Sequence, residues 1–207
     1  MSQFLQIHPD NPQPRLIQAA ANIVREGGVI AYPTDSAYAL GCHIGDKSAL
    51  ERIRALRQLD KHHNFTLMVR DLSELAVYAK VENSVFRTLK YLTPGAYTFV
   101  LPATREVPRR LMHAKRKTIG LRVPDNTVAQ ALLAELAEPL MSVTLIMPGD
   151  DEPLIDPYEI RDLIGNQVDL VIDGGYCGME PTTVVAFESD GTRLIRQGKG
   201  DSSVFNS

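Results

Sequence analysis

Apolar and polar residues recur along the chain in two spacings, which predict helices and strands in alternation. Apolar residues three or four positions apart predict helices at 15–26, 46–57, 71–78, 83–92, 126–136 and 157–163. Shorter apolar runs predict strands at 4–7, 29–32, 66–69, 97–101, 118–122, 140–145, 168–172, 183–187 and 193–196. The side chains expected to cap helices at their N-termini are those of Asp46, Asp71, Asn83 and Asn126.

Some consecutive strands in this order have no helix between them, which argues against a purely parallel sheet. We therefore expect an α/β fold: a twisted, open, mixed sheet with helices packed on it and a concave cleft lined by cations. At 207 residues the chain suits a single domain over residues 1–207. Its core is expected at about 16–198, followed by a loose tail at 199–207.

Composition and charge exclude several classes of protein. The net charge of −3 offers no general attraction to nucleic acid or membrane, so such a partner would need a local patch. The start of the chain does not resemble a signal peptide, and no apolar stretch approaches the length of a membrane span. Cys42 and Cys177 lack a CxxC spacing, and the histidines lack a metal-site spacing. We expect a soluble cytoplasmic protein with reduced thiols and no protein-ligated metal.

Polar side chains gather after the predicted strand at 29–32, within the stretch GGVIAYPTDSAYALGC at 27–42. Pro33 ends the strand because it has no backbone N–H to give to a neighbouring strand. In open α/β sheets, ligands bind at the carboxyl ends of strands. A turn whose side chains bond only to the local backbone is an equally good interpretation. The polar residues concerned are Thr34, Asp35, Ser36 and Tyr38.

Cationic and hydroxyl side chains also lie near the ends of other predicted strands. Charge-assisted hydrogen bonds and the forked arginine side chain suit phosphate and carboxylate groups. Each residue alone is more typical of a solvated surface, and only their joint placement favours an anion site. The cations are Arg57, Lys61, Arg70, Arg122 and Arg196, and the hydroxyls are Ser142, Thr144, Thr182 and Thr183.

The stretch at 27–42 resembles the opening motif of the YrdC/YciO-like family, whose best-understood members are threonylcarbamoyl-AMP synthases. The family pattern is close to G-x-V/I-x-x-P-T-D/E-T-x-Y-G-L-G, with Ser36 here in place of Thr and Ala39 in place of Gly. The heptapeptide at 118–124, TIGLRVP, is similar to the family's T-x-G-x-R-x-P. With similar segments at 57–70, 93–102, 141–144, 173–185 and 196–198, the chain is identified as a YciO-type member of this family.

This resemblance implies a cleft that binds a nucleotide and an amino acid. It implies that the nucleotide, ATP or AMP, contacts Arg57, Lys61, Thr118, Ser142, Thr144 and Arg196. It implies that the amino-acid substrate contacts Thr34, Ser36, Tyr38, Arg70, Arg122 and Thr182. Lys61 and Arg196 are the implied catalytic residues, since cations would spread the negative charge that develops during the reaction.

The implied reaction is a nucleotidyl transfer. L-Threonine and bicarbonate would form a carbamate, which would attack the α-phosphate of ATP with Mg²⁺ bridging the phosphates. The threonylcarbamoyl group would then pass to a tRNA adenosine through partner proteins. Thr144 stands where the family's S-x-N motif has asparagine, and Leu59 where the family has lysine. These departures leave open whether the full synthase reaction or a weaker or altered one takes place.

A second hypothesis needs no enzyme. The segment at 105–117 is rich in cations, and next to a cationic cleft it would form a track for RNA phosphates. Proteins of the resembled family are described as binding double-stranded RNA or tRNA. A solvated, charged loop is the alternative interpretation. The residues expected to contact RNA are Arg109, Arg110, Lys115, Arg116 and Lys117.

Overall fold

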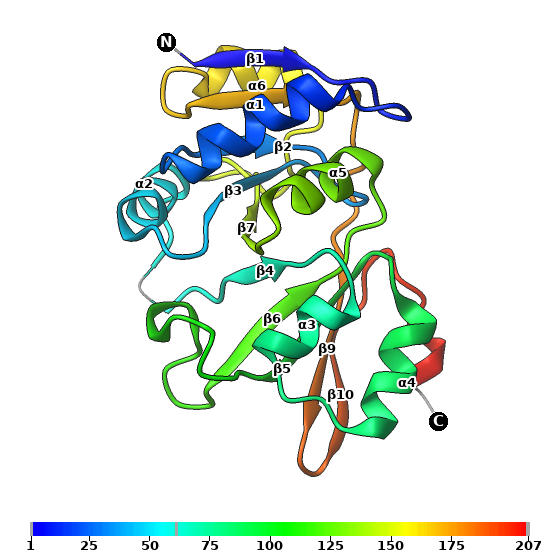
Figure 1. The fold of residues 1–207 in the computed structure, drawn as a ribbon. Helices are drawn as coiled ribbons and strands as arrows, with labels where there is room; N and C mark the ends of the chain where they lie inside the picture. Colours follow the sequence, from blue (N-terminus) through cyan, green and yellow to red (C-terminus); the bar gives the residue numbers. More distant parts are fainter. Residues whose placement is uncertain (1, 61, 206–207) are drawn as a thin grey trace.

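The computed structural model describes residues 2–60 and 62–205, in which helices pack on a twisted sheet (Figure 1). The helices are α1 (Pro14–Arg25), α2 (Lys47–Arg57), α3 (Leu72–Tyr78), α4 (Asn83–Leu92), α5 (Thr127–Leu136) and α6 (Pro157–Ile164). The first five strands are β1 (Gln3–Gln6), β2 (Ile30–Tyr32), β3 (Ala39–His43), β4 (Thr66–Met68) and β5 (Tyr97–Pro102). The others are β6 (Thr118–Arg122), β7 (Leu140–Thr144), β8 (Leu170–Asp173), β9 (Thr183–Glu188) and β10 (Gly191–Arg196).

The strands form one mixed sheet in the order β1-β8-β2-β3-β7-β4-β6-β5-β9-β10. The pairs β1/β8, β2/β8, β4/β6 and β5/β9 are parallel, and the other neighbours are antiparallel. The sheet twists strongly: in Figure 1, β1 lies nearly horizontal, whereas β9 and β10 lie nearly vertical. This arrangement confirms the predicted single α/β fold with a mixed sheet.

The two faces of the sheet are covered to different extents. One face packs against α2, α3, α4 and α6 along its whole length, through residues such as Leu50, Leu75, Leu89 and Ile160. The other face packs against α1 and α5, which lie side by side over one half of the sheet only (Figure 1). The second face is therefore left without a helix over its other half.

The predicted helix ends depend on local chemistry that the structure largely confirms. The carboxylates of Asp46 and Asp71 and the amide oxygen of Asn126 accept from the backbone N–H three residues on, at 2.8 to 2.9 Å. The prediction for Asn83 is wrong: the cap position of α4 is Glu82, without a side-chain cap bond. Gly27, with φ of 87°, follows the end of α1, where glycine takes the left-handed conformation without strain.

Strand β3 was not predicted. All its residues are buried or half-buried, so it shows none of the alternation that marks a half-exposed strand. Gly41 lies in its centre, where an added Cβ would come within 2.7 Å of the Leu140 side chain and 2.9 Å of the Tyr32 ring. This close packing explains why a glycine, normally unfavourable in a strand, is placed there.

The tail after Gly198 is not loose over its described part, 199–205. Lys199 Nζ donates to the backbone oxygen of Asp35 at 2.6 Å, and the Tyr97 hydroxyl donates to the backbone oxygen of Asp201 at 3.1 Å. The ring of Phe205 meets the rings of Tyr97 and Phe187 edge-on, each at a centroid distance of 6.5 Å. The tail therefore packs against side chains of strands β5 and β9.

Within the described residues, no helix combines the length and the apolar character that crossing a membrane requires.

The packing of the tail predicts a measurable loss of stability for Phe205→Ala. Removing the ring exposes parts of Tyr97 and Phe187, so the free energy of unfolding should fall by about 1–2 kcal/mol. Urea unfolding measures this loss. Val204→Ala is the matched control: Val204 is 36% exposed, and its truncation should change stability by less than about 0.5 kcal/mol. Equal, small effects of both substitutions would contradict a packed tail.

Candidate functional site

A cavity of about 610 Å³ lies over the half of the sheet that α1 and α5 leave open. Its floor is made by alternate residues of adjoining strands, because successive side chains of a strand point to opposite faces. The intervening residues, such as Leu67, Phe99 and Leu121, belong to the core on the opposite face. The floor residues are Thr66, Met68, Thr98, Val100, Thr118, Gly120, Arg122, Ser142, Thr144 and Val184.

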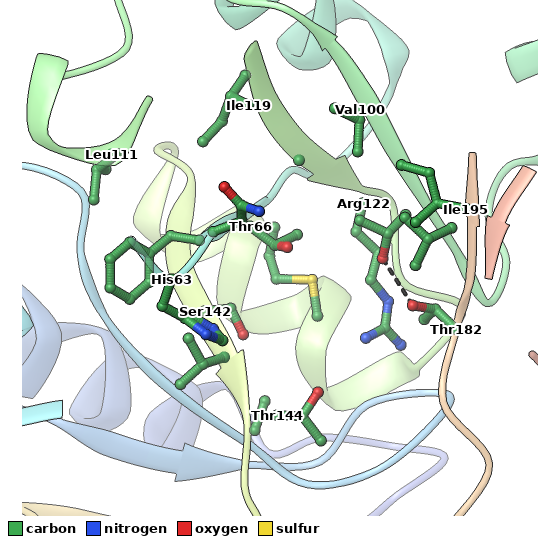
Figure 2. Close-up of a pocket in the computed structure, with 18 of the residues that line it drawn as sticks. His63, Thr66, Val100, Leu111, Ile119, Arg122, Ser142, Thr144, Thr182 and Ile195 are labelled. Atoms are coloured by element: carbon green, nitrogen blue, oxygen red, sulfur yellow. Dashed lines mark hydrogen bonds between the residues drawn. The ribbon is translucent and has the colours of Figure 1, made fainter. Parts of the chain in front are cut away.

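Small side chains keep the middle of this floor low. Thr66 of β4 pairs with Gly120 of β6 on one side and with Ser142 of β7 on the other. A Cβ at Gly120 would lie 3.0 Å from the Thr66 hydroxyl oxygen. The row therefore forms a depression between longer side chains, with His63 on one side and Arg122 and Thr182 on the other (Figure 2).

The charged groups around the cavity are almost all cations. Among the described residues no aspartate or glutamate lines it. Four arginines and two histidines do: Arg57, Arg116, Arg122, Arg196, His63 and His113. Such a surface attracts an anion, since the ligand then supplies the compensating charge.

Arg122 is held at the cavity wall by the loop that follows β2. Its side chain is only 7% exposed and forms an ion pair with Asp35. The nitrogen that contacts Asp35, Nη2 of Arg122, also donates to Ser36 Oγ at 2.8 Å and to Thr34 Oγ1 at 3.2 Å. Thr34, Asp35 and Ser36 thus hold Arg122 in place, and they do not themselves line the cavity.

The loop after β2 is locked by a second loop, the one after β8. The Tyr38 hydroxyl donates to the backbone oxygen of Gly175 at 2.6 Å and accepts from the N–H of Gly174 at 3.2 Å. Gly174 approaches Pro33 so closely that an added Cβ would lie 2.7 Å from its ring. Tyr38 is fully buried and does not line the cavity, so its position assigns it to holding the two loops together.

Arg196 lies near Arg122 on the same side of the cavity. Its Nε and Nη2 donate to the backbone oxygen of Thr182 at 3.1 and 3.0 Å, and Thr182 Oγ1 bonds with Thr98 Oγ1 at 2.8 Å (Figure 2). Partial burial, and then the charge of Arg122, lower the pKa of Arg196. The guanidinium stays charged, since an arginine pKa is far above neutral.

The two hydroxyls of the expected S-x-N position differ in environment. Ser142 is buried, and its Oγ is 2.7 Å from the hydroxyl of Tyr32, whose pKa is raised by burial. Thr144 is exposed at the end of β7, where it lines the cavity. Thr144 therefore occupies a position from which a side chain can reach a ligand.

The structure brings together most of the residues expected at the site. Arg57, Thr118, Arg122, Ser142, Thr144, Thr182 and Arg196 line the cavity. Arg70 does not: its side chain points to Asp71, with Nε 3.4 Å from the carboxylate. Lys61 lies outside the described residues, so its predicted role stays a prediction.

The cation-rich segment at 105–117 is one wall of the cavity as well as a surface loop. Leu111, His113 and Arg116 line the cavity, whereas Arg109, Arg110, Lys115 and Lys117 are exposed outside it. Sequence reasoning did not single out His63 or His113 as cavity residues. Neither has a motif spacing, and only the folded chain places them beside the strands.

His63 has the most perturbed histidine environment among the described residues. The residue is exposed, but its ring is partly enclosed at the cavity wall, and this partial burial lowers its pKa most. The charge of Arg57 lowers the pKa further, while the smaller effects of Asp60 and Arg54 oppose each other. His63 is therefore neutral at neutral pH, and an anion bound beside it would favour its protonation.

The fold and this arginine-lined cavity can be compared with those of known proteins. The Sua5/YciO/YrdC family model, with the description "Telomere recombination", matches residues 22–198. The chain belongs to the Sua5/YciO/YrdC family, which confirms the resemblance noted in the sequence.

Particular relatives are similar over nearly the whole chain. Escherichia coli K12 YciO is 58% identical over 205 residues, 99% of this chain and 100% of that protein. The crystal structure of E. coli YciO has a TM-score of 0.95, with 99% and 100% of the two chains covered. A threonylcarbamoyl-AMP synthase of Halorhodospira halophila is 31% identical over 189 residues, 91% of this chain and 98% of that protein.

A more distant structure supports the same fold. P. abyssi Sua5 complexed with L-threonine has a TM-score of 0.87 at 24% identity. The match covers 95% of this chain and 58% of the P. abyssi chain. At this level of identity the likeness shows the fold alone.

The environment of His63 predicts a pH dependence of stability. Because the pKa in the folded state is lower than in the unfolded chain, the unfolded chain binds more protons once the pH falls below about 6.5. The free energy of unfolding should therefore decrease between about pH 7.5 and about pH 5.5, and less so in His63→Gln. Urea unfolding at the two pH values checks this. The adjacent histidine, which does not line the cavity, provides the control His62→Gln, which should retain the wild-type dependence.

Proposed function

We propose that the protein binds MgATP and L-threonine in this cavity and carries out a nucleotidyl transfer like that of threonylcarbamoyl-AMP synthases. One observation carries the proposal: four arginines and two histidines line the cavity without a carboxylate among its described residues. A nucleotide is an anion of suitable size, since ligand cavities of several hundred Å³ enclose molecules of this kind. The 31% identity to the H. halophila synthase over 91% of the chain supports the reaction class.

The phosphates are assigned to the side of the cavity that carries Arg57. This guanidinium forms no ion pair with a described residue, and burial lowers its pKa. A half-buried charge without a protein counterion is stabilised by an anionic ligand. Thr118 and Thr144 line the same cavity and add neutral hydroxyl donors. Arg196, which lies nearer to Arg122, adds a second cation to the cavity.

The amino acid is assigned to the side of Arg122. An arginine held in one orientation binds a carboxylate with little loss of side-chain entropy. The P. abyssi Sua5 structure contains L-threonine, which favours an amino-acid ligand for this fold. In this arrangement Thr34, Ser36 and Asp35 orient the arginine, and Thr182 lies beside it.

In the proposed reaction the threonine carbamate attacks the α-phosphate of ATP and pyrophosphate leaves. No covalent protein nucleophile is required, because catalysis depends on positioning and on cations near the developing charge. Arg196, and the predicted Lys61, are suited to this stabilisation. Mg²⁺ would enter with the ATP and would be held mainly by phosphate oxygens and water, the oxygen ligands that it prefers.

Transfer to tRNA, and RNA binding without synthesis, form the second candidate function. The specific observation is that Arg109, Arg110, Lys115, Arg116 and Lys117 are all exposed on one segment beside the cavity. Phosphate contacts from such a segment would give strong salt dependence. Replacing Lys115 and Lys117 by glutamine should then weaken binding of duplex RNA and lower its salt slope by about two. Binding that is unaffected by these replacements would contradict the RNA role of this segment.

The first assay is pyrophosphate release from MgATP with L-threonine and bicarbonate, paired with calorimetric titration of each ligand. Release that requires all three substrates supports the synthase reaction. Binding of MgATP without release indicates an altered reaction at the same site. Absence of binding at millimolar nucleotide would overturn the proposal.

Arg57→Met tests the phosphate side. The substitution keeps an unbranched apolar side chain and removes the charge, so the dissociation constant for MgATP should rise about tenfold or more. Arg87→Met on α4, an exposed position outside the cavity, is the matched control and should leave the constant unchanged. If both substitutions raised the dissociation constant equally, the effect would come from the overall charge of the protein, and a phosphate site at Arg57 would be contradicted.

Thr144→Asn tests the departure from the family motif. The asparagine amide offers two N–H donors, where the threonine hydroxyl offers one donor. If this position contacts phosphate in the transition state, pyrophosphate release should increase about threefold to tenfold. Thr88→Asn on α4, away from the cavity, controls for the introduced amide. Unchanged release would show that the missing asparagine does not limit the reaction.

A further inference from the structure

Asp35 places a carboxylate directly behind the cavity cation Arg122. Its side chain is only 8% exposed and does not line the cavity. One carboxylate oxygen accepts from Arg122 Nη2, and the other accepts from the backbone N–H of Asp125 at 3.0 Å. The backbone oxygen of Asp35 accepts from Lys199 Nζ. Asp35 is therefore fixed by the loop after β6 and by the C-terminal tail at the same time.

These contacts use one end of the Arg122 guanidinium and leave the other end available. Among the described residues, Nη2 makes all the hydrogen bonds of this side chain, to Asp35, Ser36 and Thr34. Within the described residues Nη1 has no hydrogen-bond partner, and Nε is buried without one. Because Arg122 lines the cavity, the guanidinium is anchored through Nη2, and Nη1 remains for a ligand oxygen.

Arg57 and Arg122, on opposite sides of the cavity, differ in their protein counterions. Arg57 has no anionic partner among the described residues, whereas the charge of Arg122 is balanced by Asp35 at close range. A singly charged carboxylate can accept from Nη1 and gain the bond with modest repulsion from Asp35. For a phosphate dianion at the same place, the attraction to Arg122 and the repulsion from Asp35 both double. Because the two nearly cancel, the extra charge gains little from the pair, whereas the cost of removing a dianion from water is larger.

We propose that Asp35 is the residue that makes the Arg122 side of the cavity selective for a carboxylate over a phosphate, by orienting the guanidinium and by cancelling its excess charge. The proposal rests on the proposed function in taking an amino acid as the carboxylate ligand. It assigns the two anionic groups of the substrates to opposite sides of one cavity. A nucleotide is thereby prevented from occupying the amino-acid position with its phosphates.

Asp35→Asn tests this assignment because it keeps the shape of the side chain and removes its charge. The dissociation constant for L-threonine should rise about tenfold, since Arg122 loses its charged anchor. The constant for inorganic phosphate should fall about threefold, since the repulsion is removed. Phosphate is titrated against proteins that also carry Arg57→Met, so that the other side of the cavity contributes little. A general loss of site structure would weaken the binding of both ligands, so opposite changes in the two dissociation constants would point to the specific role of Asp35.

Ser36→Ala separates orientation from charge. It removes one acceptor of Arg122 Nη2 without altering the charge of Asp35, so threonine binding should weaken while phosphate binding does not strengthen. Asp190→Asn, in the exposed turn between β9 and β10, is the control for net charge and should change neither constant. Circular dichroism and urea unfolding establish that each variant is folded, and Ser36→Ala carries the test of orientation if Asp35→Asn does not fold.

Two results with folded Asp35→Asn would overturn the proposal. In one, the binding of threonine and the binding of phosphate both weaken; in the other, neither dissociation constant changes. The failure of the proposed function gives a different result. If the wild-type protein binds no threonine, the amino-acid assignment is wrong, and the phosphate titration alone decides the role of Asp35. Stronger phosphate binding in Asp35→Asn then still supports exclusion of phosphate, and unchanged binding rejects it.

Discussion

The contact between Arg122 and the loop at 34–36 is the interaction on which the candidate site depends. It joins the ends of β6 and β2, which are not neighbours in the sheet. A buried arginine is stable only with a counterion and hydrogen-bond acceptors, and Asp35, Ser36 and Thr34 supply both. The loop in turn keeps its shape because Tyr38 bonds to the backbone at Gly174 and Gly175. The cavity wall is thus fixed by several loops at once.

The cavity itself results from unequal covering of the sheet. Helices α2, α3, α4 and α6 bury one face, whereas α1 and α5 cover only half of the other. Several strand residues on the open half are small, hydroxyl-bearing or cationic, as at Gly120, Ser142 and Arg122, beside the apolar Met68, Val100 and Val184. A surface of this kind would be poorly stable as a hydrophobic core and is better suited to a polar ligand.

Similarity to known proteins separates two levels of conclusion. The family is shown by a match over residues 22–198, and the 58% identity to E. coli YciO extends over nearly the whole chain. The synthase of H. halophila is 31% identical, and the position of the expected asparagine is occupied by Thr144. The family membership is therefore shown, whereas the proposed reaction still depends on tests of cavity side chains such as Thr144.

The sequence by itself determined most helices and strands, because their signals are local. Capping by Asp46, Asp71 and Asn126 and the apolar spacing of α5 act within a few residues. The sequence did not predict strand β3, because a strand buried on both faces shows no alternation of apolar and polar residues. It did not predict the packed tail either, because the ring of Phe205 packs on Tyr97 and Phe187, which are distant in the chain.

The same distinction between what the sequence predicted and what only the tertiary structure decided applies to the candidate site. The motif at 118–124 pointed to Arg122 and Thr118, and both line the cavity. Only the tertiary structure decided that Tyr38 joins two loops, that Arg70 points to Asp71, and that Asp35 balances Arg122. A motif states which residue types are present, but the direction of a side chain and its partner are set by contacts between segments far apart in sequence. Those contacts exist only once the sheet has formed.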